Sequence, residues 1–438
     1  MADINLVCWI AGADIAYRVH FGAGYLPAVI FLGAGWPILA QNAVALSCGD
    51  WLYVLYGMAA EQGFPARITT ICLHSTLAIN LKQGIMTDTY RICCLEGDGI
   101  SAELIASSVA VLDALAPYFT QPVELTNHQV GFASLDMHGT TITEEVIAAA
   151  ANADGIILGP VSHAEYPPIS EGGLNPSGVL RKTLSLYANI RPARTFDGLA
   201  HYTRSAFDLV IMRENLEGFY ADRNMVAGSG EFMPTDDVAL AVRKITRTGS
   251  ANIARAAFEQ ARKRDSKKVT AIHKANVMRM SDGLFLDVVT EIAAEYPDID
   301  YDEMLVDAAA ARLVRSPEDF DVIVTTNMFG DILSDLAAEL AGSLGLGGSL
   351  NKGRDVAMAQ AQHGSAPDIA GRDIANPVSL LLSVAMLLDD IGETEAATYL
   401  ETAISQMLAA ESGRTADLGG TLGCSGFTEQ LVQRLRAG

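Results

Sequence analysis

Short apolar runs with the length of buried strands recur along the chain after residue 86. They lie at residues 155–159, 209–212, 269–272 and 320–324, and residues 87–95 run from a polar start into another strand. Periodic apolar positions predict helices at residues 180–187 and from about residue 238 to residue 264. Because strands alternate with helices and no internal repeat interrupts them, the pattern predicts an α/β fold.

Residues 1–85 have a different character. They hold only seven charged side chains, and they include all three tryptophans. Residues 21–40 are uncharged and long enough to span a bilayer, but glycines and prolines interrupt them, and no basic signal-peptide region precedes them. We interpret residues 1–85 as a leader outside the functional protein, with Met86 as its start. A membrane anchor and an additional soluble segment are the alternatives, and we do not expect a membrane location.

Composition and charge narrow the classes of function. The 438 residues are half hydrophobic and 19% charged, which indicates a globular protein of two or three domains. A net charge of -22 without a basic stripe argues against nucleic acid as a partner, although local arginines can still bind small anions. The six cysteines form no Cys-x-x-Cys pair, so we predict neither zinc nor disulfides and expect a cytoplasmic location.

Asp331 and Asp335 are the first candidates for chemistry. They follow the apolar run at residues 320–324 and are spaced i, i+4, so on a helix both carboxylates lie on one face. The two like charges repel each other unless a cation neutralises them, and oxygen ligands suit Mg²⁺ or Mn²⁺ better than Zn²⁺. The alternative is an N-cap aspartate followed by a solvated one.

Other polar residues lie at element boundaries. Arg181, Arg191 and Arg213 would suit a substrate with two or more carboxylates if they converge, and otherwise they form surface salt bridges. Lys274 ends a strand and is a candidate base, and Tyr220 could serve as the paired acid. The alternatives are a lysine that extends to solvent and a packed tyrosine.

Two glycine-containing segments are candidates for binding a nucleotide. The turn at residues 97–99 can bring its backbone close to a ligand, but no Gly-x-Gly-x-x-Gly follows any strand, so a standard Rossmann site is not indicated. The loop at residues 363–371 is rich in small residues. Its Asp368 could accept hydrogen bonds from a ribose diol and repel a 2′-phosphate, which favours NAD over NADP.

From Met86 to its C-terminus the chain resembles the isocitrate/isopropylmalate dehydrogenase family, the β-decarboxylating dehydrogenases. Seven motifs occur in the family's order: GDGI at 97–100, LRK at 180–182 with YANIRP at 187–192, REN at 213–215 with EG at 217–218 and Tyr220, HKANVM at 273–278, NMFGDILSD at 327–335, HGSAPDIAG at 363–371 with NP at 376–377, and DLGG at 417–420.

The resemblance implies a two-domain α/β fold of this family. Residues 87–187 and 343–438 would form a large cofactor-binding domain, and residues 188–342 a small domain with the metal site and the dimer contact. It implies NAD-dependent oxidative decarboxylation of a 3-substituted malate, of the 3-isopropylmalate or isocitrate type, with Mg²⁺ or Mn²⁺. A D-malate- or tartrate-type dehydrogenase and a non-catalytic regulatory subunit are the alternatives.

The resemblance also implies roles for individual residues. Tyr220 and Lys274 would be catalytic, with Lys274 supplied by the other subunit of a homodimer or higher homo-oligomer. The metal would be bound by Asp331, Asp335 and Asp307 of the partner subunit. The substrate would be bound by Arg181, Arg191, Arg213, Asn276 and Ser177. The cofactor would be bound by Ile100, His363, Gly364, Ser365, Ala366, Asp368 and Asn376.

Two departures from the family's pattern bear on ligand binding: the one at Gln360 concerns the nicotinamide contacts, and the one at residues 173–179 concerns the substrate. Gln360 stands where a glutamate is common. The substrate-selecting segment, residues 173–179, offers Asn175 and Ser177, where isopropylmalate enzymes usually have leucines and isocitrate enzymes serine and asparagine. Neither residue aligns cleanly with either pattern, so the substrate stays open.

Overall fold

The computed structural model describes residues 89–220 and 230–437 in full, and of residues 1–88 the backbone of seven strands. The chain divides into two compact units, Met1–Thr87 and Asp88–Gly438. The strands of the first unit pair antiparallel in three groups. Two groups are pairs, β1 (Ile4–Ile10) with β2 (Ala13–Val19) and β3 (Ala28–Leu32) with β4 (Trp36–Ala40). The third is a sheet of β5 (Ala43–Cys48), β6 (Trp51–Gly57) and β7 (Ile68–His74). The interpretation of residues 1–85 as a leader stays a prediction.

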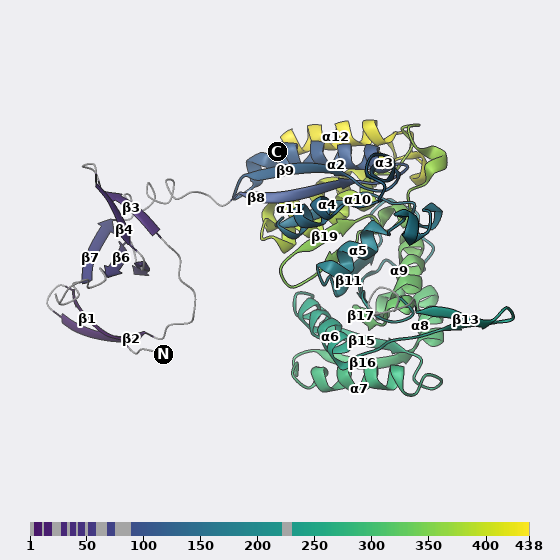
Figure 1. Ribbon diagram of the computed structural model, residues 1–438, viewed down its shortest axis with the longest axis horizontal. Helices are drawn as coiled ribbons and strands as arrows, with labels where there is room; N and C mark the ends of the chain where they lie inside the picture. The colour runs from purple at the N-terminus through teal and green to yellow at the C-terminus, as the bar shows by residue number, and fades with distance from the viewer. Residues whose placement is uncertain are drawn as a thin grey trace. The chain divides into compact units, whose positions relative to one another are not determined.

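A ten-stranded sheet runs through the second unit (Figure 1). Its spatial order is β16 (Asp300–Leu305), β15 (Lys268–His273), β17 (Val322–Thr325), β12 (Asp208–Glu214), β11 (Ala188–Arg194), β18 (Leu350–Lys352), β19 (Ala357–Gln360), β10 (Gly155–Leu158), β8 (Tyr90–Glu96) and β9 (Val123–Gln129). Only the pairs made by β11 and β18 are antiparallel. The apolar runs in the sequence are therefore strands, as predicted, and they are inner strands of a mostly parallel sheet.

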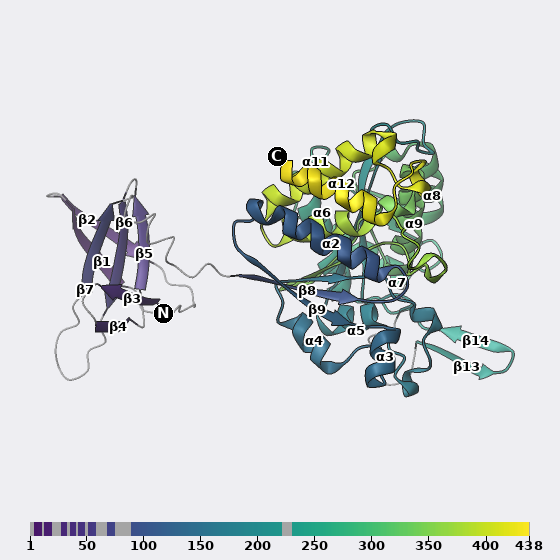
Figure 2. The ribbon, with the colours of Figure 1, turned by 90° about the horizontal axis from the view of Figure 1, so that it is seen from above.

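Helices cover both faces of this sheet, which explains why the inner strands are apolar on both sides. They are α2 (Ser101–Leu115), α3 (Phe132–His138), α4 (Glu144–Ala151), α5 (Pro176–Thr183), α6 (Arg247–Arg262), α7 (Ser281–Ala293), α8 (Val306–Arg315), α9 (Asn327–Ala341), α10 (Val378–Asp390), α11 (Thr394–Ala409) and α12 (Cys424–Ala437). Figure 2 shows α2, α11 and α12 on one side of β8 and β9, and α3, α4 and α5 on the other. None of these helices has the length and apolar character needed to cross a bilayer.

The buried apolar residues form separate clusters at the two ends of the sheet. Around β8 and β10, one cluster includes α2, α10, α11 and α12, and another includes α4 and α5. Around β12 and β17, one cluster includes α6 and α7, and another includes α8 and α9. The proposed division into residues 87–187 with 343–438 and residues 188–342 stays a prediction.

Two predicted helices have different bounds in the structure. Helix α5 ends at Thr183 and not at residue 187, because Ser185 adopts a left-handed φ of 51°. Helix α6 begins at Arg247, where Thr246 caps it by accepting a hydrogen bond from Gly249 N. Residues 238–241 are instead strand β14 (Val238–Ala241), paired with β13 (Glu231–Thr235). The larger apolar residues there alternate with alanine, which a strand satisfies as well as a helix.

Candidate active site

Helix α9 carries the two acidic residues predicted to bind a metal. It follows β17 with Thr326, not an aspartate, at the N-cap position. Asp331 and Asp335 lie one turn apart on this helix, and their side chains are 35% and 52% exposed. The structure therefore has the helix with two neighbouring carboxylates, and the N-cap alternative is wrong.

Arg213 anchors the start of α9 to the end of β12. Its Nη1 forms an ion pair with Asp331 Oδ1, and its Nη2 donates to Asn327 Oδ1 at 2.8 Å. Gly330 makes this approach possible, because a Cβ on that residue would lie 2.6 Å from Arg213 Cγ. The arginine is 3% exposed, so its charge acts in a medium of low polarity.

Arg191, on β11, bridges both carboxylates of α9. Its Nη1 lies 3.2 Å from Asp331 Oδ1 and 3.3 Å from Asp335 Oδ1, and it donates to Ser334 Oγ at 2.7 Å. Its Nε donates to Asn189 Oδ1 at 2.5 Å. Burial, and then the charge of Arg213, lower the pKa of Arg191 to about 10, so it stays charged at neutral pH. The repulsion between the two aspartates is thus offset within the chain by an arginine.

Tyr220 and Arg181 complete the surroundings of Asp331. Tyr220 Oη donates to Asp331 Oδ2 at 3.2 Å, and the Tyr220 ring lies 5.7 Å from the Arg213 guanidinium. Burial raises the pKa of Asp331. The charges of Arg213, Arg191 and Arg181 and the hydrogen bond from Tyr220 oppose this effect and outweigh it, so the pKa lies below its ordinary value. Arg191 and Arg213 therefore contact the Asp331 carboxylate, whereas Arg181 acts on it only through its charge and donates to Gln360.

Among the residues that the structure describes, Lys274, Asn276 and Asp307 make no hydrogen bond or ion pair with this cluster. Lys274 Nζ lies 2.5 Å from Asp307 Oδ1, and the hydrogen bond from Lys274 lowers the pKa of Asp307. Asn276 is exposed in the loop after β15. In the part of the chain that the structure describes, no three acidic, histidine or cysteine residues gather as a metal site would require. One chain therefore brings together two of the three predicted metal ligands.

The predicted nucleotide-binding residues Ile100 and Ser365 meet although they are distant in sequence. Ile100 N donates to Ser365 O at 2.9 Å. Gly99 has a φ of 57°, and a Cβ there would lie 2.0 Å from Ser365 O. Asp98 faces inward, because its carboxylate accepts from Phe132 N and Ser162 N, each at 2.8 Å. The turn at residues 97–99 thus packs its backbone against the loop at residues 363–371.

The remaining candidates for cofactor binding follow along this loop. Burial lowers the pKa of His363 more than the Gly364 carbonyl and Asp417 raise it, so the imidazole is neutral at neutral pH. Ala366 adopts a left-handed φ of 40°, which turns the chain into a short helix at Pro367–Ile369 with Asp368 exposed on it. Asn376 Nδ2 donates to Asp417 Oδ2 at 3.0 Å.

Several residues to which the sequence analysis gave no role hold the cluster together. Asn189, Asn327 and Ser334 contact Arg191 or Arg213. They lie inside the motifs quoted above, close in sequence to residues with predicted roles, and this position is the feature of the sequence that could have identified them. Gln362 Nε2 donates to Asp335 Oδ1 at 2.8 Å. Gln360 accepts hydrogen bonds from Ser177 and Arg181, both predicted to bind substrate. The contacts of Gln360 depend on β19 lying beside β10, which local sequence patterns do not determine.

Residues 91–431 match the family described as isocitrate/isopropylmalate dehydrogenase. The chain belongs to this family. The homoisocitrate dehydrogenase of Methanocaldococcus jannaschii is 41% identical over 355 residues, which cover 79% of this chain and 98% of the relative. Subunit 2 of the mitochondrial NAD isocitrate dehydrogenase of Kluyveromyces lactis is 39% identical over 359 residues, 81% of this chain and 93% of the relative. The crystal structure of isocitrate dehydrogenase from Methylococcus capsulatus is similar with a TM-score of 0.72 and 38% identity, over 79% of this chain and 99% of that one.

This isocitrate/isopropylmalate dehydrogenase family member is an oxidoreductase with the predicted α/β fold. The resemblance read from the motifs is confirmed over residues 91–431. Its cluster around Asp331 combines carboxylates, arginines and a phenol. Such a set can bind a carboxylate-bearing molecule and place a proton donor beside it.

Proposed function

We propose that this chain catalyses the NAD-dependent oxidative decarboxylation of a 3-substituted malate with Mg²⁺ or Mn²⁺. The observation that carries the proposal is the convergence of Arg191, Arg213 and Tyr220 on the Asp331 carboxylate beside Asp335. A malate-type substrate offers carboxylates to the arginines and a hydroxyl to a metal. No feature of the site favours a regulatory subunit, since each of these groups is present.

The donor set fits a hard divalent cation. Asp331 and Asp335 are both accessible and share one helix face, and carboxylate oxygens are the ligands that Mg²⁺ and Mn²⁺ prefer. Asp307 is 67% exposed, so it is available to a partner subunit as the third ligand. A bound divalent metal would act as a Lewis acid on the substrate's oxygen atoms and stabilise the charge left when CO₂ departs.

The protein's own groups would bind substrate and move protons. Arg181, Arg191 and Arg213 would hold the carboxylates by charge-assisted hydrogen bonds, which are stronger than neutral ones. Lys274 Nζ, from the partner subunit, would accept the proton of the C2 hydroxyl. Tyr220 Oη, already a donor to Asp331, would return a proton to C3 after the carboxylate leaves.

The loop at residues 363–371 would bind NAD, which supplies the hydride acceptor. A neutral His363 and the backbone joined by the hydrogen bond from Ile100 N to Ser365 O would offer uncharged groups to the adenosine. The exposed Asp368 carboxylate would accept hydrogen bonds from a ribose diol and disfavour a 2′-phosphate. A relative named as an NAD isocitrate dehydrogenase subunit supports this choice.

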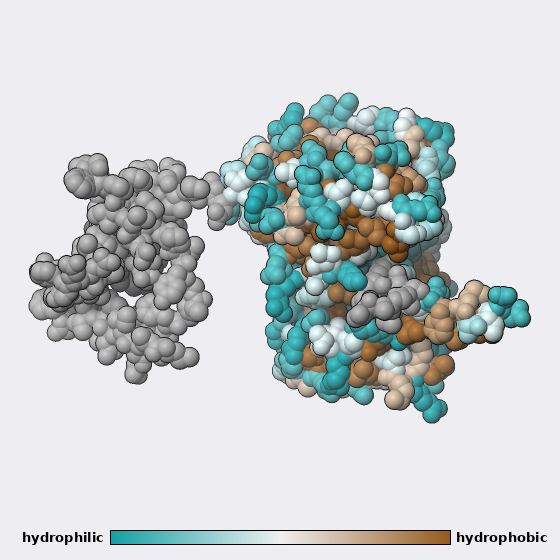
Figure 3. Space-filling model, viewed as in Figure 1, coloured by the Kyte–Doolittle hydropathy of each residue, from teal (hydrophilic) through white to brown (hydrophobic). Residues whose placement is uncertain are grey.

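We propose that the active form is at least a homodimer. The hairpin of β13 and β14 projects from the second unit and carries hydrophobic residues (Figure 3). Phe232 and Met233 are 52% and 63% exposed on it, and Met280, after Lys274, is 88% exposed. Exposed apolar patches of this kind mark interaction sites. A cytoplasmic location is also part of the proposal, supported by free, buried cysteines at positions 93, 94 and 424.

A substrate panel tests the proposed function. The full chain is incubated with NAD, Mn²⁺ and each of isocitrate, homoisocitrate, 3-isopropylmalate and D-malate, and NADH formation is followed by absorbance. At least one 3-substituted malate is expected to give NADH and CO₂ in equal amounts. If none does, the proposal is wrong; NADH without CO₂ would contradict the decarboxylation.

A further inference from the structure

Gln362 connects the proposed nucleotide-binding loop to the helix that carries the acidic residues. It follows β19 and directly precedes His363, the first residue of the loop at residues 363–371. Its Nε2 donates to Asp335 Oδ1 at 2.8 Å. Strand β19 pairs with β10 at one end of the sheet, whereas α9 packs in the cluster around β12 and β17 at the other end. The side chain therefore reaches from one end of the sheet to a predicted metal ligand of the other.

Among the residues that the structure describes, Gln362 is the closest hydrogen-bond donor to Asp335. Arg191 Nη1 lies 3.3 Å from the same oxygen, but it also lies 3.2 Å from Asp331 Oδ1 and 2.7 Å from Ser334 Oγ. An Nη1 group has two hydrogens, so it cannot bond well to three acceptors. Asp335 Oδ2 accepts no hydrogen bond in the described part of the chain, and the side chain is 52% exposed. This second oxygen is available to a cation.

The other half of the Gln362 amide shows what this contact costs. An ionised carboxylate is an acceptor only, so the nitrogen of the amide must face Asp335 and the oxygen must face away. Within the described residues, Gln362 Oε1 is buried and has no hydrogen-bond partner. A buried acceptor without a donor lowers the stability of the folded chain, so an apolar side chain of the same size would suit the fold better. A residue that costs stability is expected where it serves a site.

The backbone around Gln362 is fixed by Ser379 of α10, which is fully buried. Gln362 N donates to Ser379 Oγ at 3.1 Å, and this hydroxyl donates to Gly347 O at 2.5 Å. A Cβ on Gly347 would lie 2.4 Å from Gln362 Oε1, so the amide occupies the space above this glycine. The donor that faces Asp335 is thus held in place by the fold. A ligand held by a fixed donor has less freedom to lose when it binds a cation.

We propose that Gln362 is a positioning residue for the divalent metal. It holds Asp335 by Oδ1 and so presents Oδ2 to the cation. It acts through Asp335 and not as a ligand itself, because its oxygen faces Gly347 and only its N–H group is directed to the site. The inference rests on the proposed function and deepens it, since it assigns a role in metal binding to a residue of the segment that leads into the nucleotide-binding loop.

Two substitutions perturb the contact in independent ways. Gln362→Met keeps the size of the side chain and removes both the donor and the unpartnered oxygen. Gly347→Ala leaves Gln362 intact but displaces its amide, and a φ of -79° at Gly347 is compatible with alanine. In a Gln362→Ala chain there is no amide to displace, so Gly347→Ala should have no further effect there. Gln430→Met, at an exposed position of α12, is the control.

The experiment titrates the full chain with Mn²⁺ alone and measures the free ion by electron paramagnetic resonance. Asp335→Asn defines the binding to acidic groups elsewhere. Gln362→Met should weaken the Asp335-dependent binding by about 10- to 100-fold, as is typical for loss of a group that orients a metal ligand. Gly347→Ala should weaken it in the chain that has Gln362, and Gln430→Met should leave it unchanged.

Two further measurements separate positioning from a structural role. The urea midpoint of Gln362→Met, followed by circular dichroism, should equal or exceed that of the unmodified chain, because the buried oxygen without a partner is gone. NAD binding measured by calorimetry without metal should be unchanged. A merely structural role of Gln362 would lower the midpoint, and a role in the nucleotide-binding loop would weaken NAD binding.

Unchanged Mn²⁺ affinity in Gln362→Met would overturn the inference. So would a lowered urea midpoint, a comparable loss of NAD affinity, or an equal effect of Gly347→Ala with and without the Gln362 side chain. If the unmodified chain binds no more Mn²⁺ than Asp335→Asn does, the metal in the proposed function is refuted, and this inference with it. The formation of NADH from the substrate panel remains a separate test of the proposed function.

Discussion

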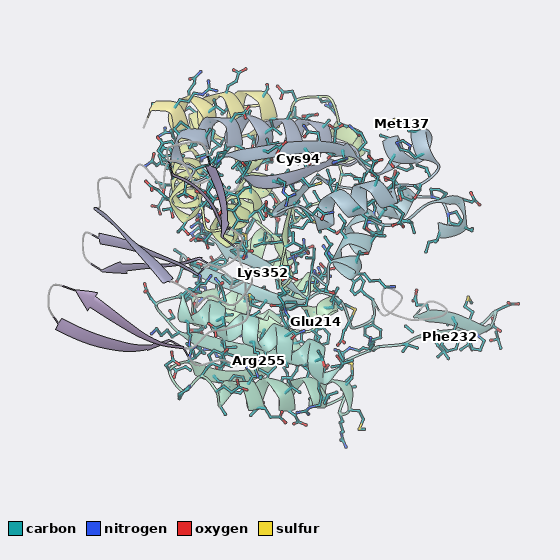
Figure 4. All side chains as sticks on the ribbon, turned by 60° about the vertical axis from the view of Figure 1, so that its left-hand side comes forward. Cys94, Met137, Glu214, Phe232, Arg255 and Lys352 are labelled. Carbon is teal, nitrogen blue, oxygen red and sulfur yellow. The ribbon has the colours of Figure 1, made fainter. Side chains whose placement is uncertain are left out.

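Glu214 offers a test of the site's electrostatics that does not depend on the substrate. The residue ends β12, directly after Arg213, and is 3% exposed (labelled in Figure 4). Its two carboxylate oxygens accept from Leu216 N at 2.7 Å and Glu217 N at 2.8 Å. These contacts begin the loop that leads to Tyr220. Protonation of Glu214 therefore acts on the segment that carries the proposed proton donor.

The magnitude follows from the pKa of this carboxyl. Burial, only partly opposed by the backbone hydrogen bonds, raises the pKa of Glu214 from its ordinary 4.5 to about 7 in the folded chain. Between these values the folded chain binds more protons than the unfolded chain, so the free energy of unfolding falls as pH rises. At about 1.4 kcal/mol per pH unit, this group should contribute a loss of about 2–3 kcal/mol between pH 5 and pH 8.

Glu214→Gln removes this pH dependence. The amide oxygen can accept only one of the two backbone donors, so the variant should be less stable at low pH by about 1–3 kcal/mol. The stability of the unmodified chain relative to the variant should then fall by about 2–3 kcal/mol from pH 5 to pH 8, so that the two chains become similar or change order. Glu429→Gln, the same change at an exposed position of α12, is the control.

The assay is urea unfolding followed by far-UV circular dichroism. Every described helix belongs to the second unit, whereas all three tryptophans lie in the first, so tryptophan fluorescence would report on the wrong part of the chain. If the curves of stability against pH run parallel for the unmodified chain and Glu214→Gln, the reasoning about this carboxyl is refuted.

Three further predictions concern catalysis and assembly. Lys274→Ala should lower turnover by about 10²–10⁴-fold, as expected for loss of a general base, without weakening NAD binding measured by calorimetry; near-normal turnover would remove Lys274 from the mechanism. Asp368→Lys should weaken NAD use and increase NADP use in steady-state kinetics, because it replaces a diol acceptor by a cation; an unchanged preference would contradict its role. Asp307→Asn and Asp331→Asn chains should each be inactive, yet regain activity when unfolded and refolded together, because mixed dimers contain one intact site; no recovery would place Asp307 outside a shared site.

The region around α9 shows which structural features the local spacing of residues can predict. An apolar run followed by Asp331 and Asp335 predicts a strand, a helix and two neighbouring carboxylates, and the structure has all three. The arginine that bridges them could not be found by spacing, because Arg191 lies 140 residues from Asp331 in sequence. Their contact depends on the order β11, β12, β17 in the sheet, which local patterns do not determine.

The error at residues 238–264 has a physical origin. Val238, Leu240 and Val242 are apolar at every second position, and they are 41%, 48% and 40% exposed. Their periodicity fits the helix that follows, but they have no core of this chain to pack against. Apolar residues that are not packed in a core follow no rule of burial within the chain, so their pattern is easily assigned to the nearest regular element.

The order of strands also constrains how the protein can be made. Strands β8, β9 and β10 form one side of the sheet and β11, β12, β15, β16 and β17 the other, and both sets are complete by Thr325. The hairpin that joins them, β18 and β19, ends only at Gln360. A growing chain therefore carries two half-sheets with unpaired edges at β10 and β11 until that hairpin leaves the ribosome. Open edges are templates for aggregation, so synthesis that pauses before residue 350 should be the step at which this protein most needs a chaperone.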